Sequence, residues 1–253
     1  MQLSYVKSLA ETEAGEKITD TIITVPPYYS QFERDAIADA IEIAGLRTLA
    51  LINDGTAVAV NYAMTRTFPE DAEYHVVYDA GASSIRASVM SFSTDKKTGT
   101  TQITAHGVGY DRKIGGTEMD RRLREILIEK FNAKSGGRDI RKDKRGMAKL
   151  WKEANRVKAI LSANTEAIST VESLAFDIDF KARVTRSEFE AACADIKTRF
   201  AQPIRDALEQ SNLSLVSTYV GLKMHSTYFI QVEHIIRYLH WRKYSRAHGS
   251  SGG

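Results

Sequence analysis

Residues 75–92 have the sequence HVVYDAGASSIRASVMSF, the clearest structural signal in the chain. Residues 75–78 and 85–92 are rich in residues that favour strands, whereas the six residues between them are small or polar. A polar turn at 96–99 leads to another β-rich run at 101–107. Three strands joined by short turns predict an antiparallel meander.

Upstream of this meander, strands and helices alternate. The expected elements are strands at 21–25 and 49–52 and helices at 32–44 and 57–64. Pro26 ends the first strand, Ser30 and Glu33 have capping-box spacing, and Gly45 lies where a left-handed helix cap is expected. This alternation predicts a mainly parallel sheet covered by helices. A polar turn at 67–71 separates it from the meander, which gives two α/β lobes.

Downstream of the meander, helical patterns dominate. Apolar residues at helical spacing predict one helix from near 117 that ends before 135, and another from about 143 to 162. Short strands are expected between 167 and 184. Thr185 and Glu188 have capping-box spacing at the start of a final helix, which Pro203 is expected to kink.

The composition limits the classes of protein and of partner. A chain of 253 residues with 43% hydrophobic residues forms one large domain or two small ones. It contains no apolar run long enough to span a membrane, and residues 1–10 lack the apolar core of a signal peptide. Residues 216–253 hold five basic residues and one acidic residue, which leaves 30 basic against 31 acidic residues in the remainder. A nucleic-acid partner is therefore not expected.

Cys193 is the single cysteine, which excludes an internal disulfide and a cysteine-rich metal site. A small buried residue on a helix is favoured over a reactive thiol at this position.

The turn at 79–84 is the strongest local candidate for a binding site. Small residues let backbone N–H groups approach a phosphate closely, and the hydroxyls of Ser83 and Ser84 add donors. Asp79, at the end of a strand, suits a water molecule bound to Mg²⁺. Taken alone, the same residues are also typical of a β-hairpin that binds no ligand, and this alternative is favoured.

Two further stretches have both a binding and a structural interpretation. Gly115 and Gly116 open a helix, and the unpaired N–H groups of a helix start attract anions. The alternative is a glycine turn with Thr117 as the N-cap. Asp54 lies at a strand-to-helix junction, where it is either catalytic or a helix cap. Local considerations favour the structural interpretation of both.

Three polar residues recur about one helical turn apart at Asn155, Lys158 and Ser162. They either contact an adenosine or form a solvated helix face, and their spacing does not distinguish the two.

In their order along the chain, these pieces resemble the heat-shock protein 70 family from about residue 1 to residue 215. The matching segments include IITVP at 22–26, LINDGTA at 51–57, the turn at 79–84, GGTEMD at 115–120 and EANRVKAILS at 153–162. Others are closer to the large ER-lumenal branch, the hypoxia up-regulated or glucose-regulated proteins: GVGYDR at 107–112, MAKL at 147–150 and LSAN at 161–164. The resemblance implies an actin-like ATPase fold with ribonuclease H-like lobes, incomplete at both ends.

The resemblance also implies a division of the chain into five segments. These are part of the first lobe at 1–70, the second-lobe sheet at 71–114, the upper second-lobe subdomain at 115–184, the return helix of the second lobe at 185–215, and an unaligned basic tail at 216–253.

The same resemblance implies roles for the candidate residues, with ATP and Mg²⁺ as cofactors. The roles are catalysis by Asp54, near the attacking water, and by Asp79, which holds the magnesium water shell; phosphate binding by Gly81, Ala82, Ser83 and Ser84; and nucleoside contact by Gly115, Gly116, Asn155, Lys158 and Ser162. The implied partners are a heat-shock protein 70 chaperone of the ER lumen and unfolded polypeptides, and the implied location is the ER lumen.

The sequence departs from the family pattern in ways that concern turnover. Arg86 replaces an acidic residue, Ala159 replaces an Arg that packs on adenine, and residues 82–84 replace a glycine-rich loop. The family's first phosphate loop and catalytic Lys have no counterpart, and the strand expected after Leu215 is not recognisable. We therefore expect an ATP-binding chaperone or nucleotide exchange factor that assists folding in the ER, binds ATP weakly and hydrolyses it negligibly.

There are two alternative functions. One is a nucleotide-independent interaction fragment that docks a partner chaperone. The other, an actin-like sugar kinase, requires a substrate Asp and a hexose site that are not found.

Residues 216–253 contain four of the six His residues. A zinc site at His225, His234 and His240 is not favoured, because it lacks cysteine and finger-type spacing. Residues 229–239 also fit an amphipathic basic helix. Sequence foreign to the family is favoured over both.

Overall fold

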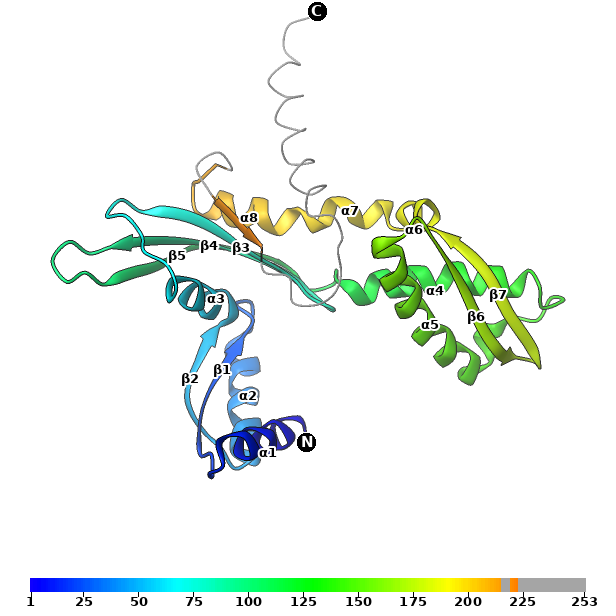
Figure 1. Ribbon diagram of the computed structural model, residues 1–253, viewed down its shortest axis with the longest axis horizontal. Helices are drawn as coiled ribbons and strands as arrows, with labels where there is room; N and C mark the ends of the chain where they lie inside the picture. The colour runs from blue at the N-terminus through cyan, green and yellow to red at the C-terminus, as the bar shows by residue number, and fades with distance from the viewer. Residues whose placement is uncertain (215–218, 223–253) are drawn as a thin grey trace, which may run out of the picture. The chain divides into compact units, whose positions relative to one another are not determined.

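The computed structural model describes residues 1–214 and 219–222, and Figure 1 shows its elements. In chain order they are α1 (Gln2–Ala14), β1 (Asp20–Val25), α2 (Gln31–Ile43), β2 (Arg47–Asn53), α3 (Asp54–Ala63), β3 (Glu73–Ala80), β4 (Ile85–Thr94), β5 (Thr101–Asp111), α4 (Gly116–Asn132), η1 (Ile140–Lys142), α5 (Lys144–Ala163), β6 (Glu166–Ala175), β7 (Ile178–Thr185), α6 (Arg186–Ala192), α7 (Ala194–Phe200), α8 (Gln202–Gln210) and β8 (Tyr219–Leu222). The zinc and amphipathic-helix hypotheses for the tail concern residues outside the described ones.

The strand–helix alternation at the N-terminal end is confirmed. Strands β1 and β2 pair in parallel from Asp20 opposite Arg47 to Val25 opposite Asn53, with a register shift between Thr21 and Ile22. Helix α2 crosses between them and begins at the predicted capping box, in which the side chain of Ser30 accepts from the Glu33 N–H. A parallel pair needs such a crossover, so the sequence order dictates the topology.

The predicted meander forms three strands of a four-stranded sheet with the order β5-β4-β3-β8. Strand β4 has the most deeply buried run, residues 87–92, which agrees with its place inside the sheet. No strand was recognisable in the sequence after Leu215, but β8 (Tyr219–Leu222) follows there and lies beside β3 in the sheet. Its pairing with a distant strand gave no signal in so short a segment.

The two predicted long helices pack against each other and against the antiparallel pair β6–β7 (Figure 1). Their facing sides are apolar, as helical spacing of the hydrophobic residues requires. The fully buried members are Leu123, Leu127, Ile128, Phe131, Leu150, Ala154 and Val157. This core fixes the position of α4 relative to α5, on which the candidate site depends.

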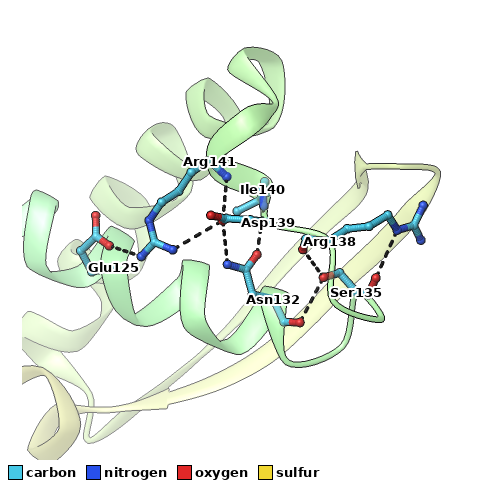
Figure 2. Close-up of polar contacts among 7 residues, drawn as sticks. All are labelled: Glu125, Asn132, Ser135, Arg138, Asp139, Ile140 and Arg141. Atoms are coloured by element: carbon cyan, nitrogen blue, oxygen red, sulfur yellow. Dashed lines mark hydrogen bonds and ion pairs between the residues drawn. The ribbon is translucent and has the colours of Figure 1, made fainter.

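The connection between α4 and α5 is held by a polar network (Figure 2). Asp139 accepts hydrogen bonds from the Asn132 side-chain amide at 2.8 Å and from the Arg141 N–H at 3.0 Å. The Asn132 side chain in turn accepts from the Ile140 N–H at 3.0 Å, and the Arg141 guanidinium pairs with Glu125 at 2.7 Å. These contacts hold the loop against α4, and side chains accept the hydrogen bonds of the loop's backbone N–H groups.

The prediction of one continuous final helix is wrong. In place of one kinked helix, α6, α7 and α8 follow one another with breaks at Cys193 and Ala201. Pro203 is the second residue of α8, where its missing N–H costs no helical bond. Cys193 is a half-buried free cysteine, and burial raises the pKa of its thiol to about 11, which agrees with a structural residue.

The described residues form two compact units. The first contains Met1–Val77, Ser88–Val108 and the described part of residues 208–221, and the second contains Tyr78–Ala87 and Gly109–Ala207. Among the residues that the structure places, no helix is both long enough and apolar enough to cross a bilayer.

Candidate nucleotide site

The turn between β3 and β4 is short and closed on itself. The Gly81 N–H donates to the Ser84 carbonyl at 2.9 Å. Ala82 and Ser83, at the tip, are exposed, whereas Ser84 is buried. The predicted phosphate loop is thus a hairpin turn whose exposed tip has only small side chains, which lets a phosphate approach the backbone.

Asp79 and Arg86 form an ion pair across this hairpin, with Arg86 Nη2 donating to Asp79 Oδ2. Asp79 lies two positions before Gly81 and Arg86 two positions after Ser84, so an antiparallel hairpin places them opposite each other. Their side chains are 28% and 18% exposed, respectively. The carboxylate expected to hold magnesium-bound water therefore already has a cationic partner.

The base of the hairpin is anchored by Tyr78. Its hydroxyl donates to the Phe200 carbonyl at 2.9 Å and is buried. Burial raises the pKa of Tyr78, and the negative charge of Asp79 raises it further. Tyr78 is therefore a neutral donor that fixes the strand end carrying Asp79.

The turn also docks onto the start of α4. The N–H groups of Gly116 and Thr117 donate to the carbonyls of Gly81 and Ala82 at 3.1 and 2.8 Å. A Cβ atom at Gly115 would lie 2.7 Å from the Ala82 carbonyl carbon, so the close approach requires glycine there. Unpaired N–H groups were expected at this helix start, but these two are paired with protein, and the N-cap is Gly115 rather than Thr117.

Lys158 is buried between α4 and α5. Its Nζ donates to the Gly116 carbonyl at 2.8 Å and pairs with Asp120 Oδ1 at 2.6 Å, and the two side chains are 3% and 8% exposed. Asn155 Nδ2 donates to the other oxygen of Asp120 at 3.3 Å. The solvated-face alternative is therefore wrong for Lys158, which instead ties two helices together.

The remaining candidate residues make local contacts. The Ser162 hydroxyl donates to the Ala159 carbonyl of its own helix at 2.6 Å. Asp54 is the first residue of α3, and its Oδ1 accepts from the Gly55 N–H at 2.7 Å. The N-cap of α3 is Asn53, and no side chain caps this helix, so the capping role that local reasoning favoured for Asp54 is wrong. Asp54 belongs to the first unit, and the other candidates belong to the second.

Asp120 is the site residue that sequence reasoning missed. It accepts a hydrogen bond from Asn155 and forms an ion pair with Lys158, so it organises two of the residues expected to contact adenosine. A signal existed: Asp120 lies next to Met119 on a helix whose buried face continues at Leu123, and an acidic residue on such a face needs a partner.

The pairing of Asp79 with Arg86 bears directly on the expected magnesium site. Among the residues that the structure describes, no three His, Cys, Asp or Glu side chains are grouped so as to hold a metal ion. Asp79, the expected contributor, is neutralised by Arg86. The turn itself fits a phosphate group better, because its tip is small and exposed.

Comparison with known proteins shows similarity to one family over most of the chain. The family model described as Hsp70 protein matches residues 1–219. Hypoxia up-regulated protein 1 of Danio rerio is 46% identical over 221 residues, which cover 85% of this chain and 23% of that protein. The protein of the same name from Rattus norvegicus is 44% identical over 223 residues, covering 85% and 22%, and that from Xenopus laevis is 43% identical over 221 residues, covering 85% and 34%.

Proposed function

Because the chain belongs to the Hsp70 family, we propose that it is the nucleotide-binding part of a chaperone and nucleotide exchange factor that assists protein folding in the ER. The family has the actin-like α/β fold that the resemblance implied. The chain spans about a quarter to a third of the length of the curated relatives that it matches. Their name, hypoxia up-regulated protein, supports a role in the stress response.

The observation that carries this proposal is the docking of the turn at 81–84 onto α4. The carbonyls of Gly81 and Ala82 accept hydrogen bonds from the first N–H groups of α4. The carbonyl of Gly116, in the same turn of that helix, accepts a hydrogen bond from Lys158 of α5. The proposed phosphate-binding residues are therefore linked by consecutive hydrogen bonds to the helix proposed to contact adenosine. Such a link holds the two halves of a nucleotide site in a set geometry.

In the proposed site, each residue of this chain has a limited task. Ala82, Ser83 and Ser84 present backbone N–H groups and hydroxyls to phosphate oxygens, whereas Gly81, whose N–H is bound by the Ser84 carbonyl, closes the turn. Asn155 and Ser162 face the nucleoside, whereas Lys158 positions α5 through Asp120 and Gly116. Bound ATP supplies the phosphoanhydride. We propose weak binding and negligible turnover, because the carboxylate of Asp79, proposed with Asp54 as catalytic, is engaged by Arg86.

Calorimetric titration of the whole chain with ATP tests the nucleotide part. We expect a dissociation constant well above the low-micromolar range, and low-micromolar affinity together with measurable phosphate release contradicts weak binding. Adding the chain to an ER Hsp70 loaded with labelled ADP tests exchange. Faster ADP release is expected, and an unchanged rate contradicts the exchange function.

The internal pairing of the site favours a second candidate, a fragment that docks a partner chaperone without nucleotide. Asp79 is satisfied by Arg86, and Asp120 by Lys158, with no ligand needed for either pair. The variant Asp79→Asn separates the two functions. If partner binding and ADP release are unchanged in this variant and in the absence of ATP, the interaction function is supported; if both are lost, it is refuted.

A further inference from the structure

The ion pair between Asp79 and Arg86 places a positive charge where a nucleotide site ordinarily has a metal cation. Triphosphates carry several negative charges, which a site must balance with positive charge. In the second unit that charge lies on a side chain directly beside the turn at 81–84, because Arg86 follows Ser84 by two positions.

We propose that Arg86 takes the place of the divalent cation in this chain, so that nucleotide binding at the turn does not depend on magnesium. The inference rests on the proposed nucleotide-binding function and specifies the charge state of the ligand, which is the metal-free nucleotide polyphosphate. It also assigns Asp79 a task, which is to hold Arg86 in position rather than to hold metal-bound water.

The position of Arg86 is built into the strand. Its neighbours Ile85 and Ala87 are both fully buried, so the backbone of β4 is fixed on either side of it. Its side chain is 18% exposed, in contrast to Arg47, whose side chain is 72% exposed in its pair with Asp20. An arginine held in this way is already oriented before a ligand arrives.

The chemistry of the two cations points the same way. A guanidinium is permanently charged and weakly hydrated, and it binds phosphate in well-defined geometry. Magnesium gives up water reluctantly and is held by carboxylates together with phosphates. A divalent cation placed at Asp79 meets the repulsion of the neighbouring guanidinium and a carboxylate whose charge is already balanced.

The test is a titration of the full chain with a fluorescent N-methylanthraniloyl ATP, in EDTA and in excess magnesium. For wild type, we expect the two affinities to agree within about twofold. For Arg86→Gln, we expect affinity in EDTA to fall about tenfold and magnesium to restore it, because the loss of one fixed charge leaves a place for the cation. The matched control is Arg183→Gln, which removes the same charge from an exposed pair with Glu166 in the same unit.

Either of two results in this titration overturns the inference. One is wild-type affinity that rises about tenfold when magnesium is added. The other is an Arg86→Gln variant whose affinity and magnesium response match those of wild type and of Arg183→Gln. Thermal unfolding of each variant confirms that it is folded.

A second measurement needs no nucleotide and separates this inference from the proposed function. Manganese, a paramagnetic substitute for magnesium, broadens amide signals near a bound ion. In wild type, we expect manganese to leave the amide signals of Gly81 and Ser84 no broader than those of other residues. In Arg86→Gln, we expect these two signals to broaden selectively. In Asp79→Asn/Arg86→Gln, we expect that selective broadening to be lost. If no nucleotide binds but this pattern appears, the proposed function fails and Arg86 still excludes the cation. Broadening in wild type, or none in Arg86→Gln, refutes the inference.

Discussion

Replacement of Lys158 by methionine is the sharpest test of how the site is held together. Lys158 and Asp120 form a pair whose side chains are 3% and 8% exposed, with 2.6 Å between Nζ and Oδ1. Methionine keeps most of the length of the lysine and removes its charge and donors. The variant leaves Asp120 buried beside an apolar side chain, and it removes the bond to the Gly116 carbonyl.

We expect Lys158→Met to lower the free energy of unfolding by about 3 kcal/mol, the lower end of the cost of breaking a buried pair. The lower end applies because Asn155 still donates to Asp120 at 3.3 Å. The double variant Asp120→Asn/Lys158→Met removes both charges, so we expect it to be less destabilised than Lys158→Met alone.

The assay is urea unfolding without nucleotide, followed by the fluorescence of Trp151 on α5 in a Trp241→Phe background. Arg183→Met is the control, because it breaks an exposed pair with Glu166 and is expected to cost less than about 1 kcal/mol. A Lys158→Met cost below about 1 kcal/mol refutes the reasoning. Such a result means that Lys158 does not stabilise the packing of α4 against α5.

Three smaller changes test other contacts. Gly115→Ala is expected to cost about 1–3 kcal/mol in urea unfolding because its Cβ overlaps the docked turn, whereas Gly81→Ala, with its nearest neighbour at 3.2 Å, costs less; equal costs contradict the docking. Thr185→Ala removes a capping-box hydroxyl and is expected to lower stability by about 1 kcal/mol, and no loss contradicts the cap. A hydrogen bond from Arg121 lowers the pKa of Glu118 from 4.5 to about 2, so the contribution of Glu118 to stability is complete above pH 4.5 and is lost toward pH 2. The difference in unfolding free energy between wild type and Glu118→Gln should therefore shrink as the pH falls through this range. A difference that does not change with pH contradicts this account.

Local patterns predicted those features that depend on neighbours in sequence. The capping boxes at Ser30 and Thr185 and the left-handed cap at Gly45 involve residues no more than a few positions apart. The hairpin at 79–84 belongs to the same class, because a short turn determines which residues face each other. Even the pair of Asp79 with Arg86 follows from counting outward from that turn, although the sequence comparison marks Arg86 only as a departure from the family pattern.

Long-range contacts were beyond the same reasoning. Lys158 is 42 residues from Gly116 and lies on another helix, so neither its burial nor its partner can be obtained from spacing on α5 alone. The break at Cys193, which separates α6 with its buried Phe189 from α7 with its buried Ile196, likewise has no local signal, since propensity favours one continuous helix. Strand β8 pairs with β3 across more than 130 residues of sequence, and four residues carry too little pattern to reveal it.

The contacts of the second unit form a single path from the turn to α5. The carbonyls of Gly81 and Ala82 accept from the start of α4, and the carbonyl of Gly116 accepts from Lys158. Each acceptor in this path is a backbone group, so a side-chain replacement cannot remove it, and only Lys158 and its partner Asp120 are open to mutation. A ligand that displaces the turn must break its bonds to the start of α4, which Lys158 and Asp120 hold against α5. The cost of that step opposes rearrangement of the turn, and it favours a ligand that fits the turn as the structure shows it.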